Sequence, residues 1–177
     1  MSKVAELHKT ISPKIIGVFI VTCSTSKFRE LKSGKKPADA SGDLIEKLLE
    51  QSEHRVEGRE LISDSLAVIR RTIRRALSRG AVDAVIITGG TGLSPRDVTV
   101  ESAKPFIEKE IPGFGELFRK VSFEEIGSPA MLSRATAGAC KGKLIFCLPG
   151  SPDGVRTALE RLILPELGHM IKVSREH

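Results

Sequence analysis

Short apolar runs alternate with helical patterns along the 177-residue chain. Ile15–Thr22, Val82–Thr88 and Leu144–Leu148 are continuous runs rich in β-branched and apolar residues, which is typical of strands buried on both faces. A weaker strand is predicted over about Arg55–Ile62. All of these runs are too short to cross a bilayer, so we expect them to form the sheet of a folded domain.

Helices are predicted between these strands. In Leu66–Leu77 the apolar residues are spaced three and four positions apart, which places them on one helical stripe, and Gly80 is predicted to end this helix. Ser41 is predicted to cap an earlier helix that has one apolar face. Later helices are predicted to begin near Thr99, at Pro112-Gly113, at Ser128-Pro129 and at Ser151-Pro152, the last of them bending at Pro165.

Strands that alternate with helices predict an α/β fold, a three-layer sandwich with a mostly parallel central sheet flanked by helices. The chain length fits a single domain over residues 1–177, with residues 1–13 as a candidate flexible N-terminal segment. Ligands of such sheets bind beyond the carboxyl ends of the strands. The segments predicted to lie there are Thr22–Gly42, Ser63–Asp64, Thr88–Asp97 and Pro149–Asp153.

The most distinctive of these segments is Thr88-Gly89-Gly90-Thr91-Gly92, which directly follows a predicted buried strand. Three glycines in five residues let the backbone approach a ligand closely, and successive N–H groups there can bind an anion. The pattern matches neither the P-loop nor the dinucleotide-binding fingerprint. A tight turn without a ligand is the alternative interpretation.

Two carboxylates are predicted at the same edge of the sheet. Asp97 follows Arg96 a few residues after the glycines, and Asp64 follows the second strand. Paired acids beside an anion-binding loop suit Mg²⁺ and phosphate chemistry, with Arg96 as a phosphate contact. The alternative for both aspartates is capping of the next helix.

Two further segments at this edge are candidates for binding anions. Gly150 and Ser151 open the last helix, where unpaired backbone N–H groups are exposed, although an ordinary strand–turn–helix junction would look the same. Five basic residues lie between Lys27 and Lys36. They are interpreted as solvated loop charge, with a lid over polyphosphate as the alternative.

The composition narrows the class of ligand. The net charge is +6, and the chain has neither Trp nor Tyr. Recognition of single-stranded nucleic acid needs exposed aromatic side chains, so small anionic ligands are favoured and no nucleic-acid partner is expected. The absence of a signal segment and of a long apolar run leads us to expect a cytoplasmic protein without membrane contact.

The cysteines and histidines show no metal-ligand spacing. Cys147 lies in an apolar run and is predicted to be a small buried hydrophobe. Cys23 lies near the end of a predicted strand, so a reactive thiol is kept as an alternative there.

Five motifs together resemble the MoaB/MogA family of molybdenum-cofactor biosynthesis proteins, and the resemblance covers about residues 14–172. The chain is closer to the MoaB type, because of its long basic insertion after the first strand. The motifs are Thr88-Gly89-Gly90-Thr91-Gly92, Ser94-Pro95-Arg96-Asp97-Val98-Thr99, Pro112-Gly113-Phe114-Gly115-Glu116, Met131-Leu132-Ser133-Arg134-Ala135-Thr136-Ala137-Gly138 and Leu148-Pro149-Gly150-Ser151-Pro152-Asp153.

The resemblance implies Mg²⁺-dependent transfer of AMP from ATP to molybdopterin, which gives adenylyl-molybdopterin and pyrophosphate. It also implies a homotrimer or homohexamer and a downstream metal-inserting enzyme as a partner. Asp64 and Asp97 match two family aspartates that this reaction needs, and they are the candidate catalytic residues and Mg²⁺ ligands. The positions implied to contact substrate or nucleotide are Thr22, Ser24, Thr25, Lys27, Thr88, Gly89, Gly90, Thr91, Gly92, Arg96, Ser133, Arg134, Gly150 and Ser151.

The chain departs from the family pattern after the first strand. Where many members have Ser-Asp, this sequence reads Thr22-Cys23-Ser24-Thr25. This difference favours an alternative function, a molybdopterin-binding or scaffold protein without catalytic activity, whereas the two retained aspartates favour the enzyme. A basic nucleic-acid module is the third hypothesis, and it predicts steeply salt-dependent binding.

Overall fold

The computed structural model describes residues 12–176, so most of the predicted flexible segment lies outside the described residues. The strands are β1 (Gly17–Cys23), β2 (Arg55–Ile62), β3 (Ala84–Thr88), β4 (Lys109–Glu110), β5 (Thr136–Cys140) and β6 (Lys143–Leu148). The helices are α2 (Thr25–Lys32), α3 (Ala40–Gln51), α4 (Leu66–Leu77), α5 (Thr99–Ala103), α6 (Pro112–Ile126), α7 (Pro152–Ala158) and α8 (Leu167–Arg175). Short turns of other helix types are η1 (Lys104–Phe106), η2 (Ser128–Leu132) and η3 (Leu159–Ile163).

The described strands form one sheet in the order β2-β1-β3-β6-β5-β4. The first four strands in this order are parallel, whereas β5 and β4 are antiparallel to their neighbours. The predicted mostly parallel α/β sheet is therefore confirmed. From β1 the chain moves to one side to form β2 and then to the other side to form β3. The order of strands thus reverses between β1 and β3, which is where ligands bind in such sheets.

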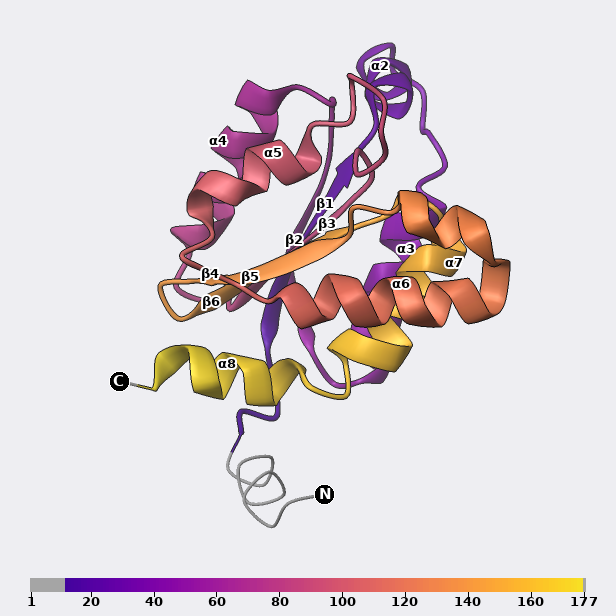
Figure 1. Cartoon of the computed structure of the whole chain (residues 1–177). Coiled ribbons are helices and arrows are strands. Elements are labelled where there is room, and N and C mark those ends of the chain that lie inside the picture. The colour runs from indigo at the N-terminus through magenta and orange to yellow at the C-terminus, as the bar shows by residue number, and fades with distance from the viewer. Residues whose placement is uncertain (1–11, 177) are drawn as a thin grey trace.

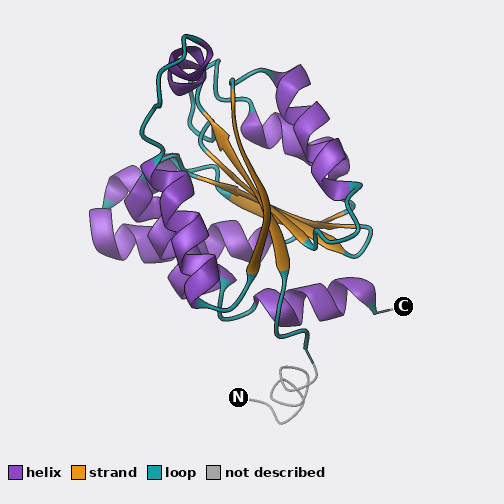
Figure 2. Ribbon diagram, turned by 180° about the vertical axis from the view of Figure 1, so that it is seen from behind, coloured by secondary structure: helices purple, strands orange, loops and turns teal. Residues whose placement is uncertain are grey.

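Helices cover both faces of the sheet, as Figures 1 and 2 show. Alternate residues of β1 point to opposite faces, so Val18 and Ile20 pack into one apolar cluster with α3, α6, α7 and α8. Phe19 and Val21 pack into the second cluster, which includes residues of α4. The three-layer sandwich is therefore built from two separate cores, one on each face.

The parallel strands end nearly level with one another. Cys23 at the end of β1 pairs with Ile62 at the end of β2, and Thr88 at the end of β3 pairs with Leu148 at the end of β6. Thr22 pairs with Thr88 across the centre. The loops that follow these four strands therefore begin along a single edge of the sheet, at the end where Figure 1 shows α2.

Several local predictions need correction. More than half of the expected basic loop Lys27–Lys36 is helical, because residues 27–32 belong to α2. Ser24 caps this helix by accepting a hydrogen bond from the Lys27 N–H. Asp39, and not Ser41, caps α3, since its side chain accepts from the Gly42 N–H.

Three other predicted helix features also differ. The helix α4 is followed by Ser78 as its C-cap, two residues before the predicted Gly80. The C-terminal helix is broken and not merely bent at Pro165, because residues 164–166 form a turn between η3 and α8. The helical piece predicted at Ser128-Pro129 is present as the short 3₁₀ helix η2, but its N-cap is Gly127 and not Ser128.

Candidate functional site

The glycine-rich loop after β3 has a backbone shape that favours glycine. Gly89 and Gly90 have φ angles of +92° and +65°, a region that residues with a Cβ rarely adopt. The Gly89 N–H donates to the Leu148 carbonyl at 3.1 Å, which holds the start of the loop against β6. Within residues 12–176, the N–H groups of Gly90, Thr91 and Gly92 have no acceptor. Unpaired successive donors are what an anion-binding loop requires, so the predicted role of this loop stays a prediction that the geometry allows.

The turn after β6 meets this loop. A methyl group placed on Gly150 would lie 3.3 Å from Gly89 Cα, so the two glycine turns are in contact. The Ser41 hydroxyl donates to the Gly150 carbonyl at 2.7 Å and anchors the turn to α3. Among the described residues, the N–H groups of Gly150 and Ser151 also lack an acceptor. Two sets of unpaired donors therefore lie side by side.

Asp64 is held against the same loop. The Thr25 N–H donates to Asp64 Oδ2 at 2.7 Å, and the Asp64 N–H donates to Thr25 Oγ1 at 3.1 Å. A methyl group on Gly90 would lie 3.4 Å from Asp64 Oδ1. The N-cap of α4 is Ser65, so the capping interpretation of Asp64 is wrong.

Asp97 lies five residues after Gly92, the last glycine of this loop. The Ser94 N–H donates to Asp97 Oδ2 at 3.0 Å, and a methyl group on Gly92 would lie 2.8 Å from that oxygen. The N-cap of α5 is Val98, so Asp97 does not cap this helix either. Within the described part of the chain, neither Asp64 Oδ1 nor Asp97 Oδ1 receives a hydrogen bond. Each carboxylate therefore has one oxygen that receives no hydrogen bond within residues 12–176.

The two acids fit Mg²⁺ better than a metal held by protein ligands alone. No group of three or more His, Cys, Asp or Glu side chains that could hold a metal occurs among residues 12–176. Mg²⁺ usually keeps several waters and binds through one or two carboxylates together with substrate phosphates. Asp64 and Asp97 beside unpaired N–H donors are a set of this kind.

A buried ion-pair network supports the end of β1. The Thr22 hydroxyl donates to Asp39 Oδ2 at 2.8 Å, and Arg59 Nη2 donates to the same oxygen at 2.7 Å. Burial alone would raise the pKa of Asp39, but the hydrogen bonds from Arg59, Thr22 and the Gly42 N–H outweigh it and hold the pKa below its usual value. Lys27 Nζ lies 4.0 Å from Asp39 Oδ1. The Thr22 hydroxyl is thus engaged within the protein.

The remaining predicted site residues differ in exposure and in their hydrogen-bond partners. Arg96 is exposed four residues after the glycine-rich loop. Ser133 and Arg134 line a cavity of about 410 Å³ beside α6. The Arg134 guanidinium donates to the backbone carbonyls of Thr91 and Asp97. Thr88 is also engaged, because its hydroxyl donates to the Pro149 carbonyl at 2.6 Å.

Sequence reasoning missed several residues that shape the site. The Thr99 hydroxyl donates to the Gly89 carbonyl at 2.8 Å, and its N–H donates to the Gly90 carbonyl at 3.0 Å. Asp39 and Arg59 were missed as well. The Thr99 contact could have been suspected from its place in the Ser94–Thr99 motif, whereas nothing local marks Arg59 as a partner of Asp39.

The cysteines are structural. Cys23, Cys140 and Cys147 are all buried. Burial raises the pKa of Cys23 to about 12, so its thiol stays protonated at neutral pH, and the alternative of a reactive thiol is not supported. Burial likewise raises the pKa of Cys147, which agrees with its prediction as a small buried hydrophobe.

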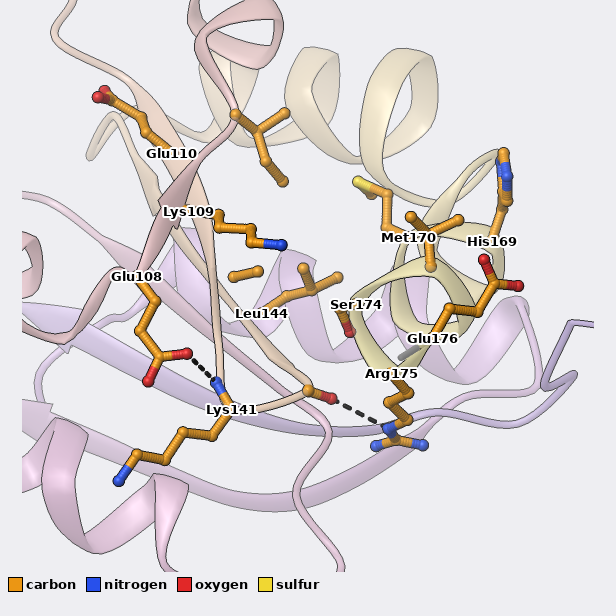
Figure 3. Close-up of a pocket in the computed structure, with 14 residues that line it drawn as sticks. Glu108, Lys109, Glu110, Lys141, Leu144, His169, Met170, Ser174, Arg175 and Glu176 are labelled. Atoms are coloured by element: carbon orange, nitrogen blue, oxygen red, sulfur yellow. Dashed lines mark hydrogen bonds between the residues drawn. The ribbon is translucent and has the colours of Figure 1, made fainter.

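A larger cavity lies at the opposite end of the sheet, between the β4–β5 edge and α8 (Figure 3). Its volume is about 670 Å³, and none of the predicted site residues line it. Its wall combines apolar side chains such as Leu144 and Met170 with a charged rim. The Arg175 Nε–H donates to the Gly142 carbonyl at 3.0 Å, and the Lys141 N–H donates to Glu108 Oε2 at 2.9 Å.

The family model described as "Probable molybdopterin binding domain" matches residues 19–169, a range that includes both aspartates and both glycine turns. The chain belongs to the MoaB/MogA family of molybdenum-cofactor biosynthesis proteins. A relative from Halalkalibacterium halodurans, named molybdenum cofactor biosynthesis protein B, is 40% identical over 168 residues, which cover 94% of this chain and 95% of the relative. The family likeness thus extends over the whole domain and places the chain in molybdenum cofactor biosynthesis.

Two other kinds of MoaB/MogA relative are informative. A protein of Methanocaldococcus jannaschii named probable molybdopterin adenylyltransferase is 43% identical over 170 residues, covering 96% of this chain and 99% of the relative. The crystal structure of the tungsten cofactor synthesizing protein MoaB from Pyrococcus furiosus matches with a TM-score of 0.82 and 36% identity, covering 93% of this chain and 100% of that one. The fold is therefore shared along nearly the full length.

One solved structure titled molybdenum cofactor biosynthesis protein B matches with a TM-score of 0.85 and 41% identity, covering 94% of this chain and 99% of that chain. Within residues 12–176, no helix has the length and apolar character needed to traverse a bilayer.

Proposed function

We propose that this protein is a molybdopterin adenylyltransferase, which transfers AMP from ATP to the terminal phosphate of molybdopterin. The observation that carries the proposal is the contact of Asp64 and Asp97 with one glycine-rich loop whose N–H groups are unpaired among the described residues. The name of the M. jannaschii relative supports the same reaction. Binding of phosphates and a divalent ion is the chemistry that these groups suit.

In the proposed reaction, an oxygen of the pterin phosphate attacks the α-phosphorus of ATP and forms a new phosphoanhydride bond. The bond between the α-phosphorus and the bridging oxygen to the β-phosphate breaks, so pyrophosphate leaves roughly in line. The N–H groups of Gly90, Thr91 and Gly92, together with those of Gly150 and Ser151, donate to phosphate oxygens. Catalysis then depends mainly on positioning and on stabilisation of negative charge.

The side chains of the site have separate tasks in this proposal. Asp64 and Asp97 would hold Mg²⁺, which would supply positive charge beside the reacting phosphates. Lys27 and Arg96 contact ATP phosphates. Ser24, Thr25 and Ser133 remain candidates for substrate contacts, although Thr25 already positions Asp64 through two hydrogen bonds.

The direct test incubates the pure protein with molybdopterin, ATP and Mg²⁺, and detects adenylyl-molybdopterin by chromatography and mass spectrometry. We expect product from the wild type and a loss of turnover on the order of 10²–10³-fold in Asp97→Asn and Asp64→Asn, because each removes a negative metal ligand. Circular dichroism should show that both variants stay folded. Glu50→Gln, which changes an exposed acid on α3, is the matched control.

Two outcomes would contradict the proposal. A wild type that binds molybdopterin but yields no adenylylated product would support the alternative of a scaffold protein, which the Thr22-Cys23-Ser24 departure favours. An Asp97→Asn variant with undiminished turnover would remove that carboxylate from the mechanism.

We also propose that the protein assembles as a homotrimer or homohexamer. Large apolar side chains are exposed on α6 and η2, where Phe123 and Met131 are 61% and 74% exposed, which suits a subunit contact. Other exposed apolar residues there are Leu117, Ile126 and Leu132. Light scattering on the purified protein gives the mass, and a monomer at micromolar concentration would contradict the proposal.

A further inference from the structure

Arg134 uses most of its hydrogen-bonding capacity inside the protein. It lies between η2 and β5, and its Nε–H donates to the Thr91 carbonyl at 3.3 Å while Nη2 donates to the Asp97 carbonyl at 2.8 Å. Nη2 also donates to Glu101 Oε2 at 3.3 Å, and Nη1 donates to Glu101 Oε1. These four bonds occupy four of the five N–H donors of a guanidinium group. Little of Arg134 is left for a ligand.

The segment that Arg134 contacts has few other anchors. The Asp97 N–H donates to the Ser94 carbonyl, and the Ser94 N–H donates to Asp97 Oδ2, so both of these bonds lie within residues 91–97. Within residues 12–176, Arg134 is the one side chain from outside this segment that hydrogen-bonds to it. Thr91 and Asp97 are the first and last residues of the segment. One planar group therefore ties its two ends together.

We propose that Arg134 is a positioning residue that clamps residues 91–97 and so holds the Asp97 carboxylate beside the loop that Asp64 contacts. Glu101 on α5 is the second member of the clamp, because its carboxylate pairs with both terminal nitrogens of Arg134. This role differs from the direct substrate contact that the family resemblance implies for Arg134. The inference rests on the proposed function only as far as it concerns Mg²⁺.

Two conservative variants test the clamp. Arg134→Lys keeps the positive charge but cannot donate to both carbonyls and to Glu101 in a fixed fork. Glu101→Gln keeps the shape of a side chain that touches Arg134 while removing the carboxylate that orients it. Both variants should act through the same segment, so the double variant should be scarcely worse than Arg134→Lys alone.

The first measurement is hydrogen exchange of the amides of residues 91–97 without substrates or metal. We expect exchange at least about tenfold faster in Arg134→Lys, and a smaller increase in Glu101→Gln, because the segment opens more often when its ends are released. The second measurement is turnover against Mg²⁺ concentration. The half-saturating concentration should rise by about tenfold or more, as for other residues that orient metal ligands, while KM for molybdopterin changes by less than about twofold.

The control pair is Arg156→Lys and Glu160→Gln, which alters an exposed Arg–Glu pair on the C-terminal helical segment with Nη1 and Oε1 3.0 Å apart. Neither change should affect the exchange of residues 91–97. Unaltered exchange in Arg134→Lys would overturn the clamp, and a raised KM for molybdopterin with that result would assign Arg134 to ligand binding. Effects of Arg134→Lys and Glu101→Gln that multiply independently would also overturn it.

The two proposals fail separately. Hydrogen exchange tests the clamp in the substrate-free protein, so its result stands even if the wild type makes no adenylyl-molybdopterin. Conversely, an active wild type whose Arg134→Lys variant keeps normal exchange and normal Mg²⁺ dependence would overturn the clamp and leave the proposed function intact. Thermal melting followed by circular dichroism checks that each variant is folded.

Discussion

The two ends of the sheet differ in how many of their polar groups are left without a hydrogen-bond partner. The cavity beside α8 is the larger, at about 670 Å³, but groups on its rim bond to one another or to the backbone, as Arg175 does with Gly142 and Asp83. The edge that follows β3 and β6 has unpaired backbone donors from Gly90 to Gly92 and two carboxylates with a free oxygen, counted over the described residues. Unsatisfied polar groups mark the candidate site better than volume does.

The difference follows from the direction of the strands. Parallel strands bring four chain exits to one edge, and each exit leaves backbone groups that the sheet does not pair. At the other end, β5 and β6 are joined by the tight turn at Lys141 and Gly142, which have φ angles of +49° and +73°. In a hairpin the backbone N–H and C=O groups of the two strands pair with each other up to the turn. Fewer unpaired backbone groups therefore remain for a ligand.

Among the variants that test this comparison, Gly90→Ala is expected to have the largest effect on stability and activity. The new methyl group would lie 2.5 Å from Thr99 Oγ1 at a residue whose φ is +65°. The variant should lose about 1–3 kcal/mol of unfolding free energy, and the displaced loop should lower adenylylation by about 10²-fold. Urea denaturation and the adenylylation assay measure the two losses.

Gly80→Ala is the control for this change, because a methyl group there meets no atom within 4 Å. Its unfolding free energy should stay within about 0.5 kcal/mol of the wild type. Full activity in Gly90→Ala would mean that the loop need not approach a ligand closely, and the comparison of the two ends would lose its main support.

A middle-sized effect on stability is expected from Asp39→Asn. Asp39 is buried and accepts from Thr22, Arg59 and the Gly42 N–H, so the amide should cost about 1–3 kcal/mol at pH 7. The pKa of Asp39 is lowered in the folded protein. Its contribution is therefore complete above the unfolded value of about 3.9 and is lost as the pH falls through the lower folded value.

Urea denaturation at several pH values checks this prediction. The difference between wild type and Asp39→Asn should be full at pH 7 and should shrink below about pH 4. Asp43→Asn is the control, because Asp43 also pairs with Arg59 but its side chain is 67% exposed, so it should cost less than about 1 kcal/mol. Equal losses for both variants would show that burial of Asp39 adds nothing.

Much of the fold could be predicted because most of its helices and strands have an apolar pattern of the matching period in their own sequence. The predicted bounds of β2 coincide with the observed Arg55–Ile62, and the apolar stripe predicted from Leu66 to Leu77 spans the observed α4, although this helix stops before the predicted Gly80. The strand β5 was missed, because Thr136–Cys140 is made mainly of small residues and depends on pairing with β6. The helix α2 was missed because it has no buried residue and therefore no apolar stripe.

The candidate site likewise contains features that could be predicted from the sequence and contacts that could not. The glycine turns and both aspartates could be predicted, because they directly follow strands and the rule for parallel sheets places them at one edge. The contacts of Arg134 with Thr91 and of Arg59 with Asp39 could not, since they join residues 43 and 20 positions apart whose local sequence carries no sign of the partner. Tertiary packing decides which polar groups are engaged and which stay free.

The smallest effect is expected at the other end of the sheet. Lys109 extends from β4 into the α8 cavity in Figure 3, and Lys109→Met removes its charge while keeping a similar apolar length. Since no candidate site residue lines that cavity, turnover and its Mg²⁺ dependence should stay within about twofold of the wild type, and unfolding free energy within about 0.5 kcal/mol. A folded variant with tenfold lower turnover would show that the α8 end takes part in the reaction, and the contrast between the two ends would fail.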